Sequence, residues 1–389
     1  MNTSGQTICL SMIVKNEAHC IRRCLDSVRP IIDHWVIVDT GSTDGTQDVI
    51  RSAMADLPGR LVERPWVDFA HNRSEALALA RPHGTYSLII DADDELVIPP
   101  GFTIPKLDIP SYSFTISDRH TEYARIQLVS NALSWCYRGV LHEFIDSKDV
   151  YWTKPMPLVM RRGEDGARHR DASTYRRDAE ILRKALDTEK DPFLIARYTF
   201  YLAQSYRDSD EPRKAIEFYS KRAELRFWQE EVYISLLSAA QLKHSLKDPE
   251  DEIRAVFDRA ISVCPHRAEA HHGATFFFRQ RGQHANAFFY AQQALHLKAP
   301  SEALFLQNWI YSYGLRDEYA VSAFNTGQYR ACFSTCLDIL DQANIPPDVR
   351  TRIAGLAREA LAKMVDPAWG CQQSPYSAEF WPCWEFAAA

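Results

Sequence analysis

The first 100 residues alternate between continuous apolar runs and stretches in which apolar residues recur at helical spacing. Continuous runs are typical of strands covered on both faces, and the spaced pattern is typical of amphipathic helices. Strands are predicted in this way at residues 7–14, 34–40, 60–65 and 86–90, and helices at 17–28, 42–57 and 70–80. Regular alternation of strand and helix predicts βαβ units, and hence a mostly parallel sheet with helices on both faces.

The pattern changes twice further along the chain. Residues 111–160 contain short runs with β character, which we interpret as the second half of the same domain, and the charged segment 161–171 is typical of a linker or mobile loop. From Asp171 onward the chain is almost wholly helical in pattern. We therefore predict an α/β domain at residues 1–170, an all-α domain at 171–365 and a tail at 366–389.

A loose repeat runs through the helical part. A small residue is followed by an aromatic residue three positions later and an alanine twelve positions later, as in Ala203, Tyr206 and Ala215 and again in Gly273, Phe276 and Ala285. The pattern resembles the tetratricopeptide repeat, in which paired helices cross at a small residue and an aromatic side chain fills the adjacent groove. An unrelated helical bundle stays open as an alternative, because the spacing is irregular.

Composition and charge narrow the setting. The 389 residues are 46% hydrophobic with a net charge of −6 and no dense run of Lys or Arg, so nothing predicts bulk attraction to nucleic acid or anionic lipid. The nine cysteines lack CxxC spacing, which predicts buried thiols in a reducing compartment. We expect no signal peptide, no transmembrane segment and a cytoplasmic location.

Polar residues follow three of the predicted strands. The segment VKNE at 14–17 follows the first strand, Asp39 ends the second, and DADD at 91–94 follows the fourth. In open α/β sheets ligands bind beyond the carboxyl ends of the strands, so these residues are expected to meet in one crevice. Such convergence is typical of a nucleotide site.

The turn after the first strand, IVKNEAH at 13–19, contains no glycine. A dinucleotide fold would place glycines there so that a helix N-terminus could approach the pyrophosphate. A diphosphate bound here must be neutralised in another way, and a divalent cation held by carboxylates is the natural substitute. The acidic segment DADDE at 91–95 could supply these carboxylates.

Other interpretations of DADDE can be compared. A calcium-binding EF-hand loop is excluded, because the positions that need Gly and Glu hold Leu96 and Phe102. An aspartyl nucleophile of the phosphatase type would be expected on the first strand rather than the fourth. A solvated acidic turn that caps the next element stays an alternative.

Three segments resemble the opening signatures of family 2 glycosyltransferases with the glycosyltransferase-A fold: SMIVKNEAHCIRRCLDSV (11–28), VIVDTGSTDGTQDVI (36–50) and IIDADDEL (89–96). NRSEALALA (72–80) and ARIQLVSNALSWCYRGVLHEF (124–144) are similar to later blocks of a subgroup that carries tetratricopeptide repeats after the catalytic domain. The resemblance implies a Rossmann-like mixed sheet followed by helical repeats. It also implies a nucleotide-sugar donor.

The resemblance assigns roles to individual residues. Asp39 would bind the base or ribose of the nucleotide, with Val14 and Glu17 lining the same pocket. Arg73 would contact the diphosphate, because its guanidinium is a fixed positive fork.

The DxD motif and a catalytic base complete the implied site. Asp93 would ligate Mg²⁺ or Mn²⁺, and Asp91 would contact the ribose, or the metal through a water. If GVLHEF (139–144) is a strand, only one of His142 and Glu143 faces the crevice. We predict Glu143 as the base that activates the acceptor and His142 as a metal or phosphate contact, with the reverse assignment open and Asp94 as a second candidate base.

Two further groups of residues are candidates with equally simple structural explanations. Arg168, His169 and Arg170 could close over the leaving diphosphate, although a charged run is more often a solvated surface. Trp135 and Tyr137 could stack on a sugar ring or belong to the core.

The function predicted from the sequence is metal-dependent, inverting transfer of a sugar from a nucleotide-diphosphate sugar, UDP-sugar above all. A peptide or protein acceptor is expected, because stacked helix pairs form a concave surface suited to peptides or to a homodimer. A lipopolysaccharide-type or other saccharide acceptor is the alternative. A scaffold that has lost activity and only binds nucleotide-sugar or a partner represents a different class.

Overall fold

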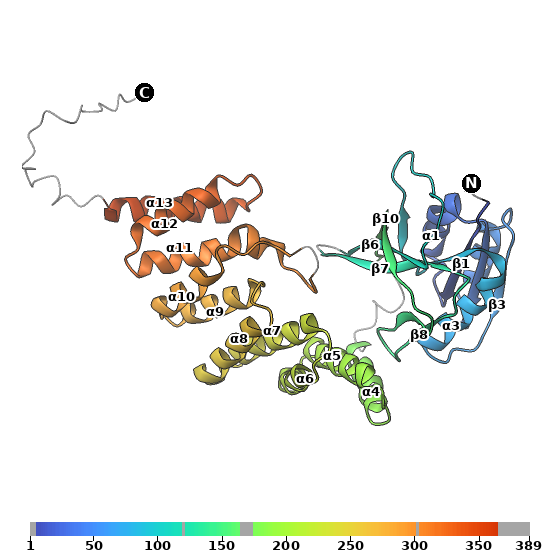
Figure 1. The fold of residues 1–389 in the computed structure, drawn as a ribbon, viewed down its shortest axis with the longest axis horizontal. Helices are drawn as coiled ribbons and strands as arrows, with labels where there is room; N and C mark the ends of the chain where they lie inside the picture. The colour runs from blue at the N-terminus through green and yellow to red at the C-terminus, as the bar shows by residue number, and fades with distance from the viewer. Residues whose placement is uncertain (1–4, 119–120, 164–173, 301–302, 365–389) are drawn as a thin grey trace, which may run out of the picture. The chain divides into compact units, whose positions relative to one another are not determined.

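The computed structural model describes residues 5–118, 121–163, 174–300 and 303–364 (Figure 1). The chain divides into two compact units, Met1–Trp228 and Gln229–Ala389. Of the predicted linker 161–171, residues 161–163 are described and Arg161 ends β10 (Thr153–Arg161), whereas the rest, with Arg168, His169 and Arg170, and the predicted tail lie outside the described residues. Within the described part, no helix is both long and apolar enough to span a bilayer.

The first unit is built on an eight-stranded sheet with the order β3-β2-β1-β4-β7-β6-β10-β5. The parallel part consists of β1 (Ile8–Val14), β2 (His34–Asp39), β3 (Gly59–Glu63) and β4 (Tyr86–Ile89). The mixed part consists of β5 (Glu95–Val97), β6 (Ser111–Asp118), β7 (Thr121–Ser130) and β10 (Thr153–Arg161). Because β7 runs antiparallel to both β4 and β6, the sheet is mixed, as predicted.

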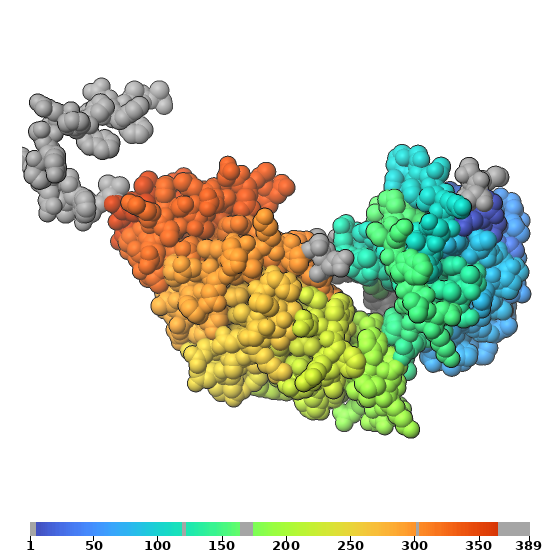
Figure 2. Space-filling model, viewed as in Figure 1, coloured from blue at the N-terminus to red at the C-terminus, as the bar shows by residue number. Residues whose placement is uncertain are grey.

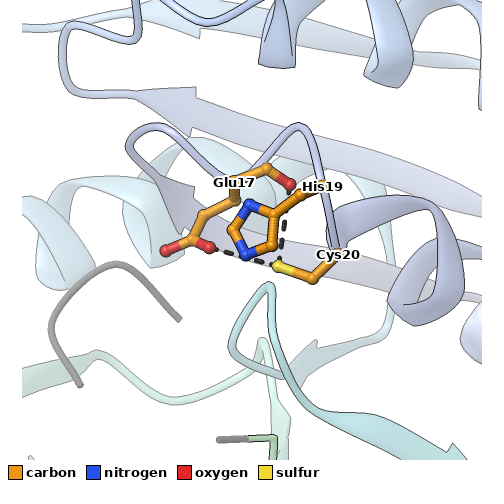
Figure 3. Close-up of side chains that lie close together, drawn as sticks. All are labelled: Glu17, His19 and Cys20. Carbon is orange, nitrogen blue, oxygen red and sulfur yellow. Dashed lines mark hydrogen bonds between the residues drawn. The ribbon is translucent and has the colours of Figure 1, made fainter. Parts of the chain in front are cut away.

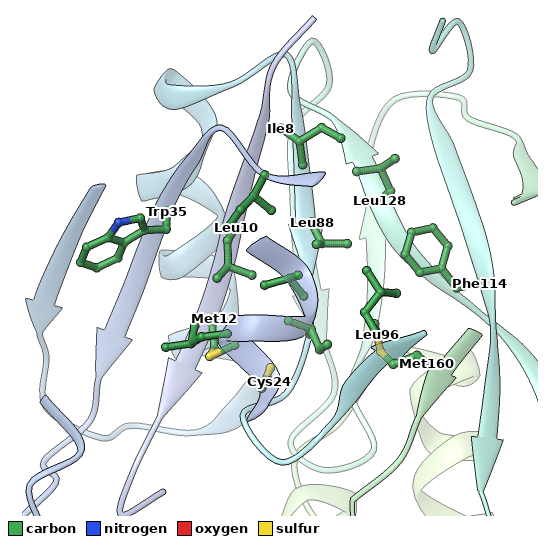
Figure 4. Close-up of a cluster of buried hydrophobic side chains, with 14 of the residues drawn as sticks. Ile8, Leu10, Met12, Cys24, Trp35, Leu88, Leu96, Phe114, Leu128 and Met160 are labelled. Carbon is green, nitrogen blue, oxygen red and sulfur yellow. The ribbon is translucent and has the colours of Figure 1, made fainter. Parts of the chain in front are cut away.

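The central strands β1, β2 and β4 are buried on both faces, which explains their continuous apolar sequences. On β1, Leu10 and Met12 join the core that α1 (Ile21–Val28) and α2 (Thr46–Ala53) cover, as Figure 4 shows. Cys9 lies on the opposite face with residues of α3 (Phe69–Ala80). Successive residues of a strand point to opposite faces, so both sets are apolar.

A two-stranded hairpin, β8 (Trp135–Arg138) and β9 (Phe144–Ser147), lies against α3. Ser74 Oγ of α3 accepts a hydrogen bond of 2.8 Å from the amide of Tyr137 in β8. The hairpin turn is also joined to α5 (Pro192–Asp208), where Tyr198 Oη accepts from the Val140 amide at 3.2 Å. These contacts tie the first helices of the α-helical part to the sheet domain.

The compact first unit therefore extends to Trp228 and includes α4 (Thr174–Leu186), α5 and α6 (Pro212–Glu224). The change from strands to helices falls near residue 170, as the sequence pattern indicates. The two divisions differ because α5 packs against the β8–β9 turn, a contact between distant segments that the local pattern does not show.

The second unit is all α-helical, and consecutive helices pack in pairs. In the space-filling view its side chains form a continuous body (Figure 2). A short π-helix, η4 (Ile310–Gly314), precedes α11. The α-helices are α7 (Gln229–Ser245), α8 (Glu250–Val263), α9 (Glu269–Gln280), α10 (His284–Ala294), α11 (Leu315–Asn325), α12 (Tyr329–Leu340) and α13 (Pro347–Met364). Nearest-neighbour packing of this kind is the architecture of helical repeat proteins, and the predicted fold class is confirmed.

The seven cysteines in the described part of the chain are free thiols, and six of them are buried. This agrees with the prediction of buried thiols for these positions.

Candidate active site

The loop after β2 folds back on Asp39, the last residue of that strand. Asp39 is buried, and its Oδ1 accepts hydrogen bonds from the amides of Gly41 (2.8 Å) and Ser42 (2.7 Å). Its Oδ2 is buried with no hydrogen-bond partner. A buried carboxylate oxygen without a donor is costly, so this atom is suited to accept a hydrogen bond from a bound ligand.

Glycines in the DTGSTDGT loop are required by its backbone. Gly41 and Gly45 have φ angles of +104° and +90°, in the region that side chains with a Cβ rarely adopt. Val14, at the end of β1, accepts hydrogen bonds through its carbonyl from the amide and hydroxyl of Thr40. The amide of Glu17 donates to Thr46 Oγ1 at 2.9 Å. The structure thus places Val14 and Glu17 in segments joined to the loop that follows Asp39.

Asp91 follows β4 and is held by two arginines. Arg73 Nη2 of α3 lies 2.5 Å from Asp91 Oδ1, and Arg125 Nη2 of β7 lies 3.8 Å from Asp91 Oδ2. Burial acts to raise the pKa of Asp91, but the charges of Arg73 and Arg125 outweigh it and lower the pKa to about 2. Asp91 is therefore an ionised carboxylate at neutral pH.

The neighbouring acidic residues have different environments. Asp94 is buried, its Oδ1 accepts from the Gly163 amide at 3.2 Å, and its Oδ2 lies 3.5 Å from Arg125. Burial, followed by the charge of Asp91, raises the pKa of Asp94 to about 7. The carbonyl of Asp93 accepts a hydrogen bond of 2.6 Å from Arg23, which fixes the backbone of the acidic turn. Glu95 starts β5 and pairs with Arg161 on the surface.

Glu143 joins the same ion-pair cluster from the β8–β9 turn. Its Oε1 lies 2.8 Å from Arg73 Nε, so one guanidinium bridges Asp91 and Glu143, although that N–H is not aligned for a good hydrogen bond. Arg73 Cζ lies over the ring of Tyr137, 5.6 Å from the ring centroid. Burial raises the pKa of Tyr137 to about 12. The acidic turn after β4 and the predicted base thus meet at one arginine.

His142 contacts helix α5. Residues 141–143 form a turn rather than the strand considered from the sequence, with a φ of +104° at Gly139 and +50° at His142. The imidazole is exposed and stacks on Tyr201 of α5 at 3.8 Å between ring centroids, and the His142 carbonyl accepts from Arg197. Because the backbone turns here, the His142 side chain contacts Tyr201 whereas the Glu143 side chain contacts Arg73.

The acidic turn suits a hard cation in its donor chemistry. Asp91 and Asp93 offer carboxylate oxygens, the ligands that Mg²⁺ and Mn²⁺ prefer, and the low pKa of Asp91 keeps one of them charged. Groups of three side chains with ligand atoms within 4.8 Å do occur in the described part of the chain, but none includes Asp91, Asp93 or His142. Any further ligands at this turn would have to come from the donor or from solvent.

Trp135, one of the two aromatic candidates, lies in β8. Trp135 contacts Tyr151 edge to face, with 4.8 Å between ring centroids, and packs with buried residues, so its contacts are those of a core residue.

Arg125 was not predicted from the sequence, although it bridges Asp91 and Asp94. The only sequence signal for Arg125 was its charge within the mostly apolar run ARIQLVS (124–130). The position of Arg125 near Asp91 depends on the pairing of β7 with β4, which are distant in sequence.

Comparison with known proteins identifies relatives of two parts of the chain. Residues 9–106 match the family described as Glycosyl transferase family 2. A TPR repeat-containing protein of Synechococcus elongatus is 30% identical over 200 residues, which cover 46% of this chain and 47% of the relative. An uncharacterized glycosyltransferase of Rickettsia bellii is 36% identical over 85 residues, which cover 22% of this chain and 27% of the relative. The chain thus spans less than half the length of these curated relatives.

Among solved structures, a thermophilic TPR protein of Thermus thermophilus aligns at 18% identity with a TM-score of 0.31, covering 47% of this chain and 91% of the other. The first part of the chain thus matches glycosyltransferase family 2 over residues 9–106, and paired helices similar to tetratricopeptide repeats follow it.

Proposed function

We propose that the protein is a metal-dependent, inverting glycosyltransferase that transfers a sugar from a nucleotide-diphosphate sugar, with UDP as the first nucleotide to test. One observation carries the proposal. Within residues 9–106, which match glycosyltransferase family 2, β2 ends at the partly unpaired carboxylate of Asp39, and Asp91 after β4 pairs with Arg73 of α3. Arg73 also pairs with Glu143 of the β8–β9 turn, outside the matched residues.

The donor would occupy this edge of the sheet. Asp39 Oδ2 would accept a hydrogen bond from the nucleoside, and Val14 and Glu17 would line the pocket. Asp91 and Asp93 would hold Mg²⁺ or Mn²⁺, which supplies neutralising charge for the diphosphate when it is bound. Arg73 would offer a guanidinium fork to the same phosphates.

Glu143 would accept the proton of the acceptor nucleophile. Its side chain pairs with Arg73 and keeps 13% of its surface exposed. Asp94 is the second candidate, because its pKa of about 7 would let it exchange a proton near neutral pH. The buried position of Asp94 favours Glu143, since the base must reach the acceptor. His142 would act as a contact for the leaving diphosphate only if its turn moved away from Tyr201.

The experiment that tests the proposal is titration of the protein with UDP, with and without Mn²⁺, followed by donor hydrolysis and transfer assays. Asp93→Ala should lose metal-dependent binding and transfer, whereas Asp26→Ala, in an exposed pair with Arg22, should behave as wild type. Glu143→Gln should keep UDP binding and lose transfer. Absence of UDP binding at millimolar ligand would instead favour a scaffold.

We further propose that the helical repeats bind the acceptor, a peptide or protein, because stacked helix pairs present extended surfaces. Incubation with a donor panel, followed by mass spectrometry of candidate peptides and saccharides, would identify the acceptor class. A saccharide acceptor modified in the absence of any modified peptide would overturn this part of the proposal.

A further inference from the structure

The turn between β1 and α1 has a backbone that is fixed from outside. The Glu17 amide donates to Thr46 Oγ1 at 2.9 Å, and the Ala18 amide donates to Asp44 Oδ2 at 3.0 Å. The Cys20 amide closes the turn by donating to the Glu17 carbonyl at 3.1 Å. Because the backbone of this turn is already fixed, little backbone entropy would be lost when its side chains bind a common ligand.

Three side chains of different chemistry converge on this turn. The carboxylate of Glu17, the imidazole of His19 and the thiol of Cys20 each offer one ligand atom, and these atoms lie within 4.8 Å of one another (Figure 3). Cys20 Sγ donates to Glu17 Oε2 at 3.1 Å. Cys20 is buried, and His19 is exposed, so the cluster is open to solvent on one side.

The donor set selects a class of metal. A thiolate and an imidazole together favour a borderline-soft ion such as Zn²⁺, whereas Mg²⁺ and Mn²⁺ favour oxygen ligands alone. Cys20 also stands at the N-cap of α1, where the helix dipole favours a negatively charged thiolate. The cluster therefore differs in kind from the carboxylates of Asp91 and Asp93.

A second cluster of the same composition provides an internal comparison. Glu230, Cys264 and His266 also bring ligand atoms within 4.8 Å. There, however, the fully buried guanidinium of Arg267 forms an ion pair with Glu230. Arg267 also pairs with Glu269 and has no exposed surface, unlike the partly exposed arginines beside Asp91, so it has no solvent-exposed position to take up when an ion binds Glu230. This second cluster is therefore a poor metal site.

We propose that Glu17, His19 and Cys20 form a binding site for a zinc-class divalent ion. On binding, the Cys20 thiol loses its proton to solvent and the sulfur forms a bond to the metal, while His19 binds as neutral imidazole and Glu17 as carboxylate. Three protein ligands leave a fourth tetrahedral position for water or another ligand. The bound ion joins the end of β1 to the start of α1 and stabilises the turn.

The test uses the full chain, freed of metal by dialysis against a chelator, and Co²⁺ as a spectroscopic substitute for Zn²⁺. We expect one equivalent of Co²⁺ to give a thiolate-to-cobalt charge-transfer band and the intense visible bands of a tetrahedral ion. Cys20→Ser should lose the charge-transfer band. Its affinity should fall by at least about tenfold, the scale of weakening seen even when an outer-shell partner is lost.

Two further variants keep the result interpretable. His19→Gln changes an exposed side chain, so the fold should persist, and it should weaken binding while retaining the sulfur band. Cys264→Ser alters the second cluster and should leave the spectrum unchanged. Zn²⁺ should raise the melting temperature of the wild type and of Cys264→Ser, but not that of Cys20→Ser.

The proposal is overturned if the charge-transfer band survives in Cys20→Ser. It is also overturned if wild-type protein binds Co²⁺ no more tightly than His19→Gln. Neither result depends on glycosyltransferase activity, so the metal site and the proposed function can fail separately.

Discussion

Arg73 is the residue on which the candidate active site depends for its charge balance. Its side chain is only 15% exposed, and its guanidinium contacts the carboxylates of Asp91 and Glu143. We predict that Arg73→Gln lowers the free energy of unfolding by about 2–4 kcal/mol, because removing one partner of a buried ion pair leaves uncompensated charge. Urea denaturation at pH 7.5 measures the change.

Arg22→Gln is the matched control for this variant. Arg22 pairs with Asp26 on the surface of α1, with the two side chains 59% and 51% exposed. Exposed pairs contribute little, so the expected loss is below about 0.5 kcal/mol. Equal losses in the two variants would contradict the importance assigned to the Arg73 cluster.

At this scale the sequence predicted where the acidic residues lie but not their partners. Asp39 ends β2 and Asp91 follows β4, so their position at the carboxyl edge of the sheet could be predicted from the strand pattern. Arg125 could not be found, because its place beside Asp91 and Asp94 depends on the antiparallel pairing of β4 with β7. The orientation of His142 was also hidden, since it depends on a turn with positive φ angles.

Among the helices, the crossing of α8 and α9 tests the packing role of a small residue. A Cβ on Gly273 would lie 2.7 Å from Cε1 of Phe257, which is buried in the core. We predict that Gly273→Ala is destabilising by about 1–3 kcal/mol, the usual cost of overpacking, despite the higher helix propensity of alanine. Thermal or urea unfolding measures the sign.

Gly355 of α13 has no heavy atom within 4 Å of the position of a Cβ. Gly355→Ala should therefore raise the stability by up to about 1 kcal/mol through helix propensity alone. If both variants were stabilising, Phe257 would be able to move aside and the close helix crossing would not be required.

Helix α9 also carries a group that should make stability depend on pH. Burial lowers the pKa of His272 to about 4, and the charge of Arg279 acts in the same direction, while Asp317 and Glu269 oppose it. The unfolded chain, with an ordinary pKa of 6.5, therefore takes up a proton first as the pH falls. The contribution to stability is complete above about pH 6.5 and is lost progressively toward pH 4.

We expect His272→Asn to reduce the drop in unfolding free energy between pH 7 and pH 5 by about 1–2 kcal/mol. The exposed His71 of α3 provides the control, and His71→Asn should leave the pH dependence as it is in the wild type. An unchanged pH slope in His272→Asn would show that folding does not lower the pKa of His272. The neighbouring His271, whose pKa burial also lowers, should retain part of the slope.

Over the whole molecule, the order of strands and helices was predictable and the extent of the compact units was not. Hydrophobic periods are local, so they located β1 to β4 and the helical part. The attachment of α5 to the β8–β9 turn rests on contacts such as Val140 with Tyr198, which are 58 positions apart in sequence. Contacts of this range have no local signature.

The division into two units predicts two unfolding transitions, because each unit has its own core. Arg267→Met should lower only the transition of the second unit, since it removes the buried partner of Glu230 and Glu269, at a cost of about 3–5 kcal/mol. Arg73→Gln should lower only the other transition. Differential scanning calorimetry of both variants assigns the transitions.

Ligand provides an independent assignment of the same transitions. If the proposed function holds, UDP with Mn²⁺ at about one hundred times its dissociation constant stabilises the first unit by about 2.7 kcal/mol and leaves the second where it is. Arg254→Met, in an exposed pair, controls for surface charge in the second unit and should move neither transition. The alternative outcome is a single transition that shifts in every destabilised variant. It would show that the two units, divided at Trp228, unfold together as one cooperative unit.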